Sequence, residues 1–525
     1  MTTVPTRVPI TFAPDGTVVW VEPGTTVSNA AEAAGVVIPA PCGGRGVCGS
    51  CGVRIVSGSL SEPDDAELQG LSRAPKGVRL ACRARVEVPV EVRPLVTNAL
   101  SYAQTSHPDS HELSLVAAID LGTTSVAAVL IDAETGRELA RASVANRQQS
   151  AGADVLSRIA AAELGAGDAL RVAAETSIIE VLRAATSMAS VSLAWVHRLV
   201  IAGNSAMAGL LTGSELRGLA VHPFTAPAYD SVLTSSRLSA ELAPDAEITV
   251  LGPIASFVGG DTVAAIVATG LLGTRGPALM VDLGTNAEVV LASGGELTVA
   301  SAAAGPAFEG AGITCGGPAA DGAITRLIAA SDGEVHFEVL GGGEPQWLSG
   351  SGVVSAVAML RRLGHIDGSG LFVQEGPLQA HFDRDSTGVA FFAFGEGPGC
   401  LSLSQLDVRA VQLAIAAIQV AVTTVLSAAG CSAGDLTAVY VAGALGFSVD
   451  AEDLVSLGIL PREVVGITRR VGNAALVGAA AIALDQEALT SVADALARAT
   501  SIELASSAGF SEVFLGAMAL EPYSA

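Results

Sequence analysis

The sequence predicts a multidomain chain that combines an α+β domain with two α/β lobes. Four of its seven cysteines fall within the first 82 residues, in a β-rich segment. A polar, aperiodic stretch follows at 95–113. Beyond it, one strand–turn–strand pattern occurs twice, which indicates a duplicated fold. The expected divisions are a first domain at 1–94, a linker at 95–113, and lobes at 114–273 and 274–525.

The composition is that of a large folded chain with an acidic balance. Half of its 525 residues are apolar and 15% are charged, so a sizeable core can form. Lys and Arg total 28 against 52 Asp and Glu, which gives a formal net charge of −24. Without a basic run, this balance argues against a nucleic acid or an anionic membrane surface as partner.

Neither a membrane span nor a secretory leader is expected. The apolar run 254–272 contains Gly259, Gly260 and Asp261, and two glutamines interrupt the run 410–426. Neither run reaches the roughly 20 cleanly apolar residues that a span needs. The N-terminus continues directly into a strand, without an apolar signal core. We therefore expect a cytoplasmic protein whose cysteines do not form a disulfide framework.

The first domain is expected to begin with a β-hairpin and a short helix. Residues 8–13 and 17–22 are β-rich and flank a Pro-Asp-Gly turn. Thr25 or Thr26 can cap the helix that follows, which ends at a glycine. These elements indicate a small α+β domain.

Four cysteines of this domain have the spacing C-x5-C-x2-C-x30-C. They are Cys42, Cys48, Cys51 and Cys82. Three thiolates can come from one tight loop when glycines relieve its backbone, and this loop is rich in glycine. A structural zinc site is the alternative, but such sites usually show two C-x2-C knuckles and only one is present. The spacing therefore favours an iron–sulfur cluster with two irons.

The segment 8–93 resembles the plant-type and adrenodoxin-type [2Fe–2S] ferredoxins. The five residues between its first two cysteines, Cys42 and Cys48, are closer to the spacing of the adrenodoxin type. The resemblance implies a β-grasp fold in which the four cysteines bind the cluster. Such a cluster carries one electron at a time.

The repeated pattern carries the sequence Asp-Leu-Gly-Thr, at 120–123 and again at 282–285. In each copy an apolar run leads into the Asp, and a second β-rich run follows the turn. Gly and small hydroxyl residues let backbone N–H groups approach phosphate oxygens. A carboxylate at the strand end can hold Mg²⁺ or its water. One such hairpin is a weak signal, whereas two facing copies would clamp the phosphates of a nucleotide.

A third segment, 438–448, is an apolar strand that runs into a turn containing Gly443 and Gly446. The order of the three motifs resembles the actin-like ATPase superfamily, whose duplicated, ribonuclease H-like α/β lobes close over ATP. The resemblance implies that Asp120 and Asp282 organise Mg²⁺, and that the two glycines contact adenosine. The implied phosphate-binding residues are Gly122, Thr123, Thr124, Gly284, Thr285 and Asn286.

Three acidic residues near these motifs allow two interpretations each. Glu288 follows the second hairpin, and strand alternation could point it into the cleft or away from it. Asp261 is expected to cap a helix at 262–272 rather than to face the cleft. Glu309, in a Gly-rich loop, is a plausible cleft residue, and a solvated loop acid is the alternative. The apolar stripe at 408–426 is expected in the core.

The combination of both parts resembles the reductive activators of corrinoid proteins over nearly the whole chain. Supporting segments are 201–211, 222–230, 257–271, 303–313, 349–367, 402–418 and 472–484. The resemblance implies ATP-dependent transfer of one electron from the cluster to a corrinoid protein in the Co(II) state, which restores Co(I) for methyl transfer. It also implies an upstream electron donor and a homodimer.

Other functions remain open from the residues. An ATP-coupled donor to another low-potential acceptor, such as a dehydratase, would place a [4Fe–4S] cluster between subunits. The ATPase half has no extra cysteine pair for it, because Cys315, Cys400 and Cys431 lack partner spacing. An ATP-switched redox sensor would transfer no net electron. A sugar or acetate kinase would need a catalytic base in the cleft and would leave the ferredoxin domain without a purpose.

Overall fold

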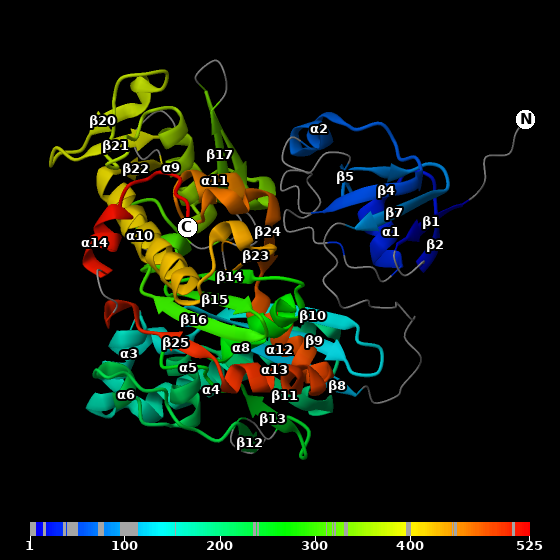
Figure 1. The fold of residues 1–525 in the computed structure, drawn as a ribbon. Coiled ribbons are helices and arrows are strands. Elements are labelled where there is room, and N and C mark those ends of the chain that lie inside the picture. The colour runs from blue at the N-terminus through cyan, green and yellow to red at the C-terminus, as the bar shows by residue number, and fades with distance from the viewer. Residues whose placement is uncertain are drawn as a thin grey trace, which may run out of the picture. The chain divides into compact units, whose positions relative to one another are not determined.

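The structure is a computed structural model, shown as a ribbon in Figure 1. It describes residues 7–13, 17–34, 38, 51–71, 78–94, 114–152, 154–234, 238, 241–310, 312–317, 319, 322–329, 334–394, 401–443, 445, 449–506 and 510–525. Cys42, Cys48, Cys400, Gly446 and the expected linker at 95–113 lie outside the described residues. The chain forms two compact units: Met1–Ser114 with Ile131–Leu139, and Leu115–Leu130 with Ala140–Ala525.

The N-terminal unit contains a five-stranded mixed sheet in the order β2-β1-β7-β4-β5 (Figure 1). β1 (Val8–Phe12) pairs antiparallel with β2 (Thr17–Val21) and parallel with β7 (Val90–Pro94). β4 (Gly52–Gly58) pairs antiparallel with β7 and with β5 (Val78–Leu80). The shorter elements are β3 (Thr25–Thr26), α1 (Val27–Ala33), α2 (Asp65–Leu71) and β6 (Arg85–Val86). The predicted β-grasp fold, with its first hairpin and helix, is confirmed.

The alternation of side chains along β1 explains how this sheet covers its core. Val8, Ile10 and Phe12 are buried, and they pack with helix α1 and with both described cysteines in one apolar cluster. On the edge strand β2, Val18 and Trp20 remain exposed. A period of two therefore directs every second side chain inward, as expected for a sheet with one covered face.

The larger unit contains two six-stranded sheets. The first has the order β10-β9-β8-β11-β13-β12, and the second has the order β24-β23-β14-β15-β16-β25. The strands of the first are β8 (Leu115–Leu121), β9 (Ser125–Asp132), β10 (Glu138–Ala145), β11 (Val196–Gly203), β12 (Val232–Thr234) and β13 (Glu247–Val250). The strands of the second are β14 (Ala278–Leu283), β15 (Ala287–Ser293), β16 (Glu296–Ala302), β23 (Ala438–Gly443), β24 (Thr468–Gly472) and β25 (Thr500–Ile502).

Five strands of each sheet correspond in order and in register. Strands β10-β9-β8-β11-β13 of the first match β16-β15-β14-β23-β24 of the second. In the parallel pair β8–β11, Asp120 lies opposite Ala202; in the pair β14–β23, Asp282 lies opposite Ala442. The predicted duplication is therefore confirmed at the level of individual residue pairs.

Helices and two small sheets complete the larger unit. The helices are α3 (Val155–Ala161), α4 (Gly167–Ala189), α5 (Ser205–Thr212), α6 (Arg217–Ala220), α8 (Gly260–Thr269), α9 (Gly350–Arg362), α10 (Gln405–Ala428), α11 (Ala451–Ser456), α12 (Ala474–Leu484), α13 (Glu487–Ala497) and α14 (Phe510–Gly516). The small sheets contain β17 (Ala323–Ala329), β18 (Val335–Val339) and β19 (Trp347–Leu348), and β20 (Phe382–Arg384), β21 (Ala390–Ala393) and β22 (Ser402–Ser404). Figure 1 shows α12 crossing α8 beside the first sheet.

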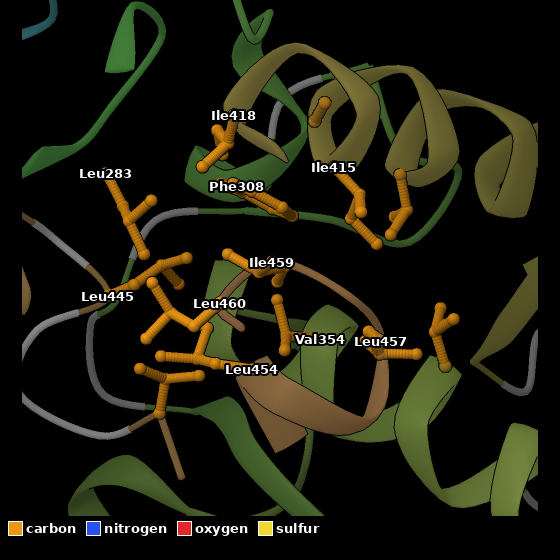
Figure 2. Packing of buried hydrophobic residues seen from close by; sticks show 14 of the residues in the cluster. Leu283, Phe308, Val354, Ile415, Ile418, Leu445, Leu454, Leu457, Ile459 and Leu460 are labelled. Atoms are coloured by element: carbon orange, nitrogen blue, oxygen red, sulfur yellow. The ribbon is translucent and has the colours of Figure 1, made fainter. Parts of the chain in front are cut away.

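Helix α10 is the central helix of the main core. Its length and its mean hydropathy of 1.8 would suit a membrane span, but 67% of that apolar window is buried inside the protein. Its one fully buried amide, Gln412, donates hydrogen bonds to the carbonyl oxygens of Ser369 and Met518. Figure 2 shows Ile415 and Ile418 of this helix packing around Phe308. The expectation that 408–426 belongs to the core is confirmed.

Candidate functional site

The two described cysteines of the predicted cluster site lie together in the N-terminal unit. Cys51 directly precedes β4 and Cys82 follows β5. Their Sγ atoms are 3.3 Å apart, and both side chains are buried. The backbone N–H of Ala81 donates to the carbonyl oxygen of Cys51 at 2.9 Å, which joins the two loops. Two thiols brought together from separate loops suit ligands of one iron–sulfur cluster.

A buried ion pair positions the strand that leads to Cys82. The Glu67 carboxylate of α2 accepts two hydrogen bonds from Arg79, both at 2.8 Å, and one from the backbone N–H of Leu80 at 2.9 Å. Glu67 is only 1% exposed. Helix α2 is thereby fixed to β5, two residues before Cys82. No local sequence pattern identifies this pair, because its partners belong to different elements.

The two predicted phosphate hairpins occupy equivalent turns, between β8 and β9 and between β14 and β15. A Cβ added to Gly122 would lie 2.7 Å from the carbonyl oxygen of Ser125. A Cβ added to Gly284 would lie 3.1 Å from the carbonyl oxygen of Asn286. Glycine at this position lets each turn close tightly, as the predicted phosphate motif requires.

The carboxylate of Glu309 joins the two hairpins. Its Oε1 accepts the backbone N–H of Thr285 at 2.8 Å and the hydroxyl of Thr285 at 2.6 Å. Its Oε2 accepts the hydroxyl of Thr124 at 3.2 Å. Glu309 is therefore a residue of the candidate site and not a solvated loop acid. The structure brings the turns that contain Thr124 and Thr285 to opposite sides of one carboxylate.

Four further acidic side chains at and beside the hairpins are near enough to repel one another. They are Asp120, Asp261, Asp282 and Glu288. The three aspartates are half-buried, and Glu288 is buried. Glu288 lies opposite Asp282 in the β14–β15 pair and accepts a hydrogen bond from Ser301 at 3.2 Å. Of its two interpretations, the structure supports the one in which Glu288 faces this cluster.

Low solvation and mutual repulsion shift the cluster toward its protonated forms. Burial, together with the negative charges of Asp261 and Asp120, raises the pKa of Asp282 to about 7. Burial raises the pKa of Asp120 to about 6, although a hydrogen bond from Asn473 favours its ionised form. Burial likewise raises the pKa of Asp261 to about 6. Such a cluster favours a nearby cation, and Mg²⁺ prefers carboxylate, water and phosphate oxygens.

The direct ligands available to a metal are few. Within the described ranges, no group of three or more His, Cys, Asp or Glu side chains is arranged to hold a metal ion. Mg²⁺ is usually bound by one or two carboxylates together with waters and substrate phosphates. Asp120 and Asp282 would suit a Mg²⁺ site of this kind. The described residues do not form a site in which protein side chains supply all the ligands.

The expectation that Asp261 caps a helix is wrong. The residue at the N-cap of α8 is Gly259, and Asp261 lies in the first turn, where it accepts the N–H of Thr262 at 2.7 Å. A Cβ on Gly259 would lie 2.5 Å from the Cα of Asn204. The helix therefore starts against the backbone of a neighbouring turn. This close contact directs Asp261 toward the acidic cluster.

Two asparagines of the site were missed by the sequence analysis. Asn204 caps α5 and donates to the hydroxyl of Thr123 at 3.2 Å. Asn473 caps α12 and donates to Asp120 Oδ2 at 2.7 Å. Each follows the last glycine of a strand, Gly203 or Gly472. A repeated Gly-Asn after an apolar strand is the signal that could have identified both.

The predicted adenosine turn begins directly beside the second hairpin. Gly443 pairs with Leu283 in register and has a φ of 86°. A Cβ there would lie 2.5 Å from Asp282 Oδ1. Only glycine fits this conformation and this contact. Gly446, the other residue of the predicted turn, lies outside the described residues.

Family models match three consecutive parts of the chain. Residues 10–87 match a 2Fe-2S iron-sulfur cluster binding domain. Residues 115–274 match the RACo middle region, and residues 276–524 match the C-terminal domain of RACo, the ASKHA domain.

Curated and solved relatives agree with these matches. The chain is 34% identical over 413 residues to the "Corrinoid activation enzyme RamQ" of Eubacterium limosum, covering 76% of this chain and 69% of the relative. It is 29% identical over 441 residues to the "[Co(II) methylated amine-specific corrinoid protein] reductase" of Methanosarcina barkeri, covering 76% and 75%. A solved "Reductive activator for corrinoid,iron-sulfur protein" shares the fold, with a TM-score of 0.72, 24% identity and 98% of both chains covered. The chain therefore belongs to the RACo family, the reductive activators of corrinoid proteins.

Proposed function

We propose that this chain is an ATP-dependent reductase of corrinoid proteins. It transfers one electron from a [2Fe–2S] cluster to a corrinoid protein in the Co(II) state and regenerates Co(I). The observation that carries the proposal is the presence in one chain of the paired Cys51 and Cys82 and of two facing phosphate hairpins. Relatives named for corrinoid activation and for reduction of a Co(II) corrinoid protein support it.

The two parts are needed together because the electron transfer is uphill. The Co(II)/Co(I) couple lies below a plant-type cluster, whose potential is about −400 mV. For a one-electron couple, about 59 mV corresponds to a factor of ten in the equilibrium constant. ATP must offset this gap by favouring one conformation of the complex over another. A nucleotide site in the same chain provides that coupling.

The family resemblance supports the following roles of the residues, and the contacts of the described ones agree with it. Cys42, Cys48, Cys51 and Cys82 hold the cluster, which supplies the single electron. Asp120 and Asp282 organise Mg²⁺, and Gly443 and Gly446 border the adenosine. The turns supply the phosphate contacts through Gly122, Thr123, Thr124, Gly284, Thr285 and Asn286. Asn473 positions Asp120, and Asn204 positions Thr123.

The proposal extends to the setting of the protein. The domains are taken as 1–94, 114–273 and 274–525, with a linker at 95–113 between the first two. We place the protein in the cytoplasm, where an upstream electron donor reduces the cluster, and infer a homodimer from the family resemblance. The partner is a corrinoid protein of a methyltransferase system.

An anaerobic reduction assay tests the proposal. The protein is reduced, freed of dithionite and mixed with a Co(II) corrinoid methyltransferase component, and absorbance reports Co(I) with and without Mg-ATP. We expect Co(I) only with ATP, and none from Asp282→Ala with its cluster intact. Glu512→Gln, at an exposed position of α14, is the control that keeps full activity.

Each other outcome separates the alternatives. Cluster oxidation that ignores ATP would indicate a simple ferredoxin. Bound ATP with an intact cluster but no Co(I) would indicate another acceptor or an ATP-switched sensor, and would overturn the proposal.

A further inference from the structure

The carboxylate of Glu309 occupies an unusual position among the predicted phosphate-binding groups. It accepts three hydrogen bonds, from the N–H and hydroxyl of Thr285 and from the hydroxyl of Thr124. These donors belong to the turns that the duplicated motif assigns to a nucleotide. A carboxylate and a phosphate are both anionic, and both accept hydrogen bonds through oxygen. A carboxylate can therefore take the place of a phosphate at these three hydrogen-bond donors.

A buried cation lies against the backbone of the first hairpin. Arg158 is fully buried, and its guanidinium donates to the carbonyl oxygen of Thr123 at 2.6 Å and to that of Gly152 at 2.9 Å. The guanidinium also donates to the amide oxygen of Gln148 and to the sulfur of Met207. All these partners are neutral groups. Among the described residues no carboxylate hydrogen-bonds to this guanidinium, and Asp154 acts on it only through its charge, so Arg158 adds positive charge that favours an anion near the first hairpin.

The loop that carries Glu309 is held in place by the core. Glu309 ends the 3₁₀ turn Pro306–Glu309, and Phe308, the residue before it, is buried among α10 side chains (Figure 2). The N–H of Gly305 donates to the carbonyl oxygen of Thr285 at 2.9 Å. Gly310, with a φ of 77°, ends this turn. A Cβ added to Gly310 would lie 2.5 Å from the carbonyl oxygen of Gly317. The turn Pro306–Glu309 is therefore fixed by its contacts and positions the Glu309 carboxylate against the hairpins.

We infer that Glu309 occupies the hydrogen-bond donors that the terminal phosphates of ATP require, and that ATP displaces it. The inference rests on the proposed nucleotide site and adds a positioning residue to it. Glu309 holds the two hairpins together through these hydrogen bonds. In the complex the phosphates take over its donors, so the turn Pro306–Glu309 must move or rotate its carboxylate away. ATP therefore binds in competition with a group of the protein itself.

Glu309→Gln tests the inference, with Glu512→Gln as the charge-matched control at an exposed site. Calorimetry measures the affinity of each variant for Mg-ATP, Mg-ADP and AMP, and thermal unfolding is recorded with and without nucleotide. The amide keeps the shape of the side chain and removes the competing charge. We expect Glu309→Gln to bind Mg-ATP roughly tenfold more tightly, the scale of one charge-assisted hydrogen bond, with AMP affinity unchanged.

The shift of the unfolding temperature on addition of Mg-ATP is the readout that a merely structural residue would not increase. The variant should unfold at a lower temperature without nucleotide, because the bridge between the hairpins is weaker. It should show a larger upward shift with Mg-ATP, because tighter binding stabilises more. Glu309→Asp, which retains the charge on a shorter side chain, should keep the weaker affinity of the original protein.

The outcomes distinguish this inference from the nucleotide site itself. Unchanged or weaker ATP binding by Glu309→Gln, with or without loss of hydrolysis, overturns the competition and leaves the nucleotide site standing. Equal gains for ATP and AMP overturn it as well, since the phosphates would then not be involved. Failure of every variant and of the original protein to bind ATP overturns the proposed function together with the inference.

Discussion

Replacing Gly443 by alanine should destabilise the larger unit and weaken nucleotide binding. Gly443 has a φ of 86°, a conformation that costs an L residue about 1–2 kcal/mol. An added Cβ would also lie 2.5 Å from Asp282 Oδ1 and 2.5 Å from the carbonyl oxygen of Leu283. Relieving such an overlap in a packed site costs about 1–3 kcal/mol. The expected loss in the free energy of unfolding is therefore roughly 2–5 kcal/mol.

A second glycine separates the two contributions. Gly430 has a φ of 63°, and nothing lies within 4 Å of a Cβ added there. Gly430→Ala should therefore cost only the conformational part, about 1–2 kcal/mol, and leave ATP affinity unchanged. Urea unfolding followed by far-UV circular dichroism measures the losses, and calorimetry measures ATP affinity. Equal losses and equal affinities for the two variants would refute the reasoning, because the contact with Asp282 would then carry no energy.

Two further predictions concern buried charges. Glu67→Gln should destabilise the N-terminal unit by about 3–5 kcal/mol, because it leaves the Arg79 guanidinium poorly compensated. On heating, the absorbance of the iron–sulfur cluster should decay faster in this variant than in the exposed control Glu62→Gln. Equal decay in the two variants would contradict the role of the Glu67–Arg79 pair. The raised pKa values of Asp120, Asp261 and Asp282, about 6, 6 and 7, mean that the folded state binds more protons than the unfolded state, whose aspartates titrate near 3.9. The contribution of these three carboxyls to the free energy of unfolding without nucleotide should therefore be largest below pH 4 and fall as the pH rises through 6 and 7, by about 2–3 kcal/mol from Asp282 alone between pH 5 and 7.5. Urea titrations of the original protein and of Asp282→Asn at these two pH values measure this contribution, and a contribution that rises across the window would contradict it.

The sequence predicted those parts of the candidate site whose residues lie within short contiguous motifs. The hairpins at Asp120 and Asp282 are contiguous, so strand, turn and glycine could be recognised without a structure. The spacing around Cys51 and Cys82 was informative in the same way, because the ligand chemistry of a cluster restricts loop length. The β-grasp fold and the duplicated lobes followed from these motifs and from the resemblance that they supported.

Contacts between distant residues were the part that could not be predicted. Asn473 binds Asp120 across 353 residues, and Thr124 binds Glu309 across 185 residues. No local pattern contains such a pair. Asp261 was misassigned because acidic residues in the first turn of a helix usually interact with its N-terminus, whereas here the packing of Gly259 against Asn204 sets the start of α8. Tertiary packing overruled a local preference at that position.

The apolar character of α10 has a consequence for the synthesis of the chain. As the segment Gln405–Ala428 leaves the ribosome, it has the length and hydropathy by which a membrane helix is recognised. One of its faces, with Ala416 and Val420, is covered by Phe510, Phe514 and Ala517 in and beside α14, which are translated much later. For that interval the helix is exposed to aggregation and to mistargeting. The capping box of Ser404 and Asp407 is local and can form as soon as the helix is made, whereas Gln412 gains its Met518 acceptor only after the covering segment has been translated.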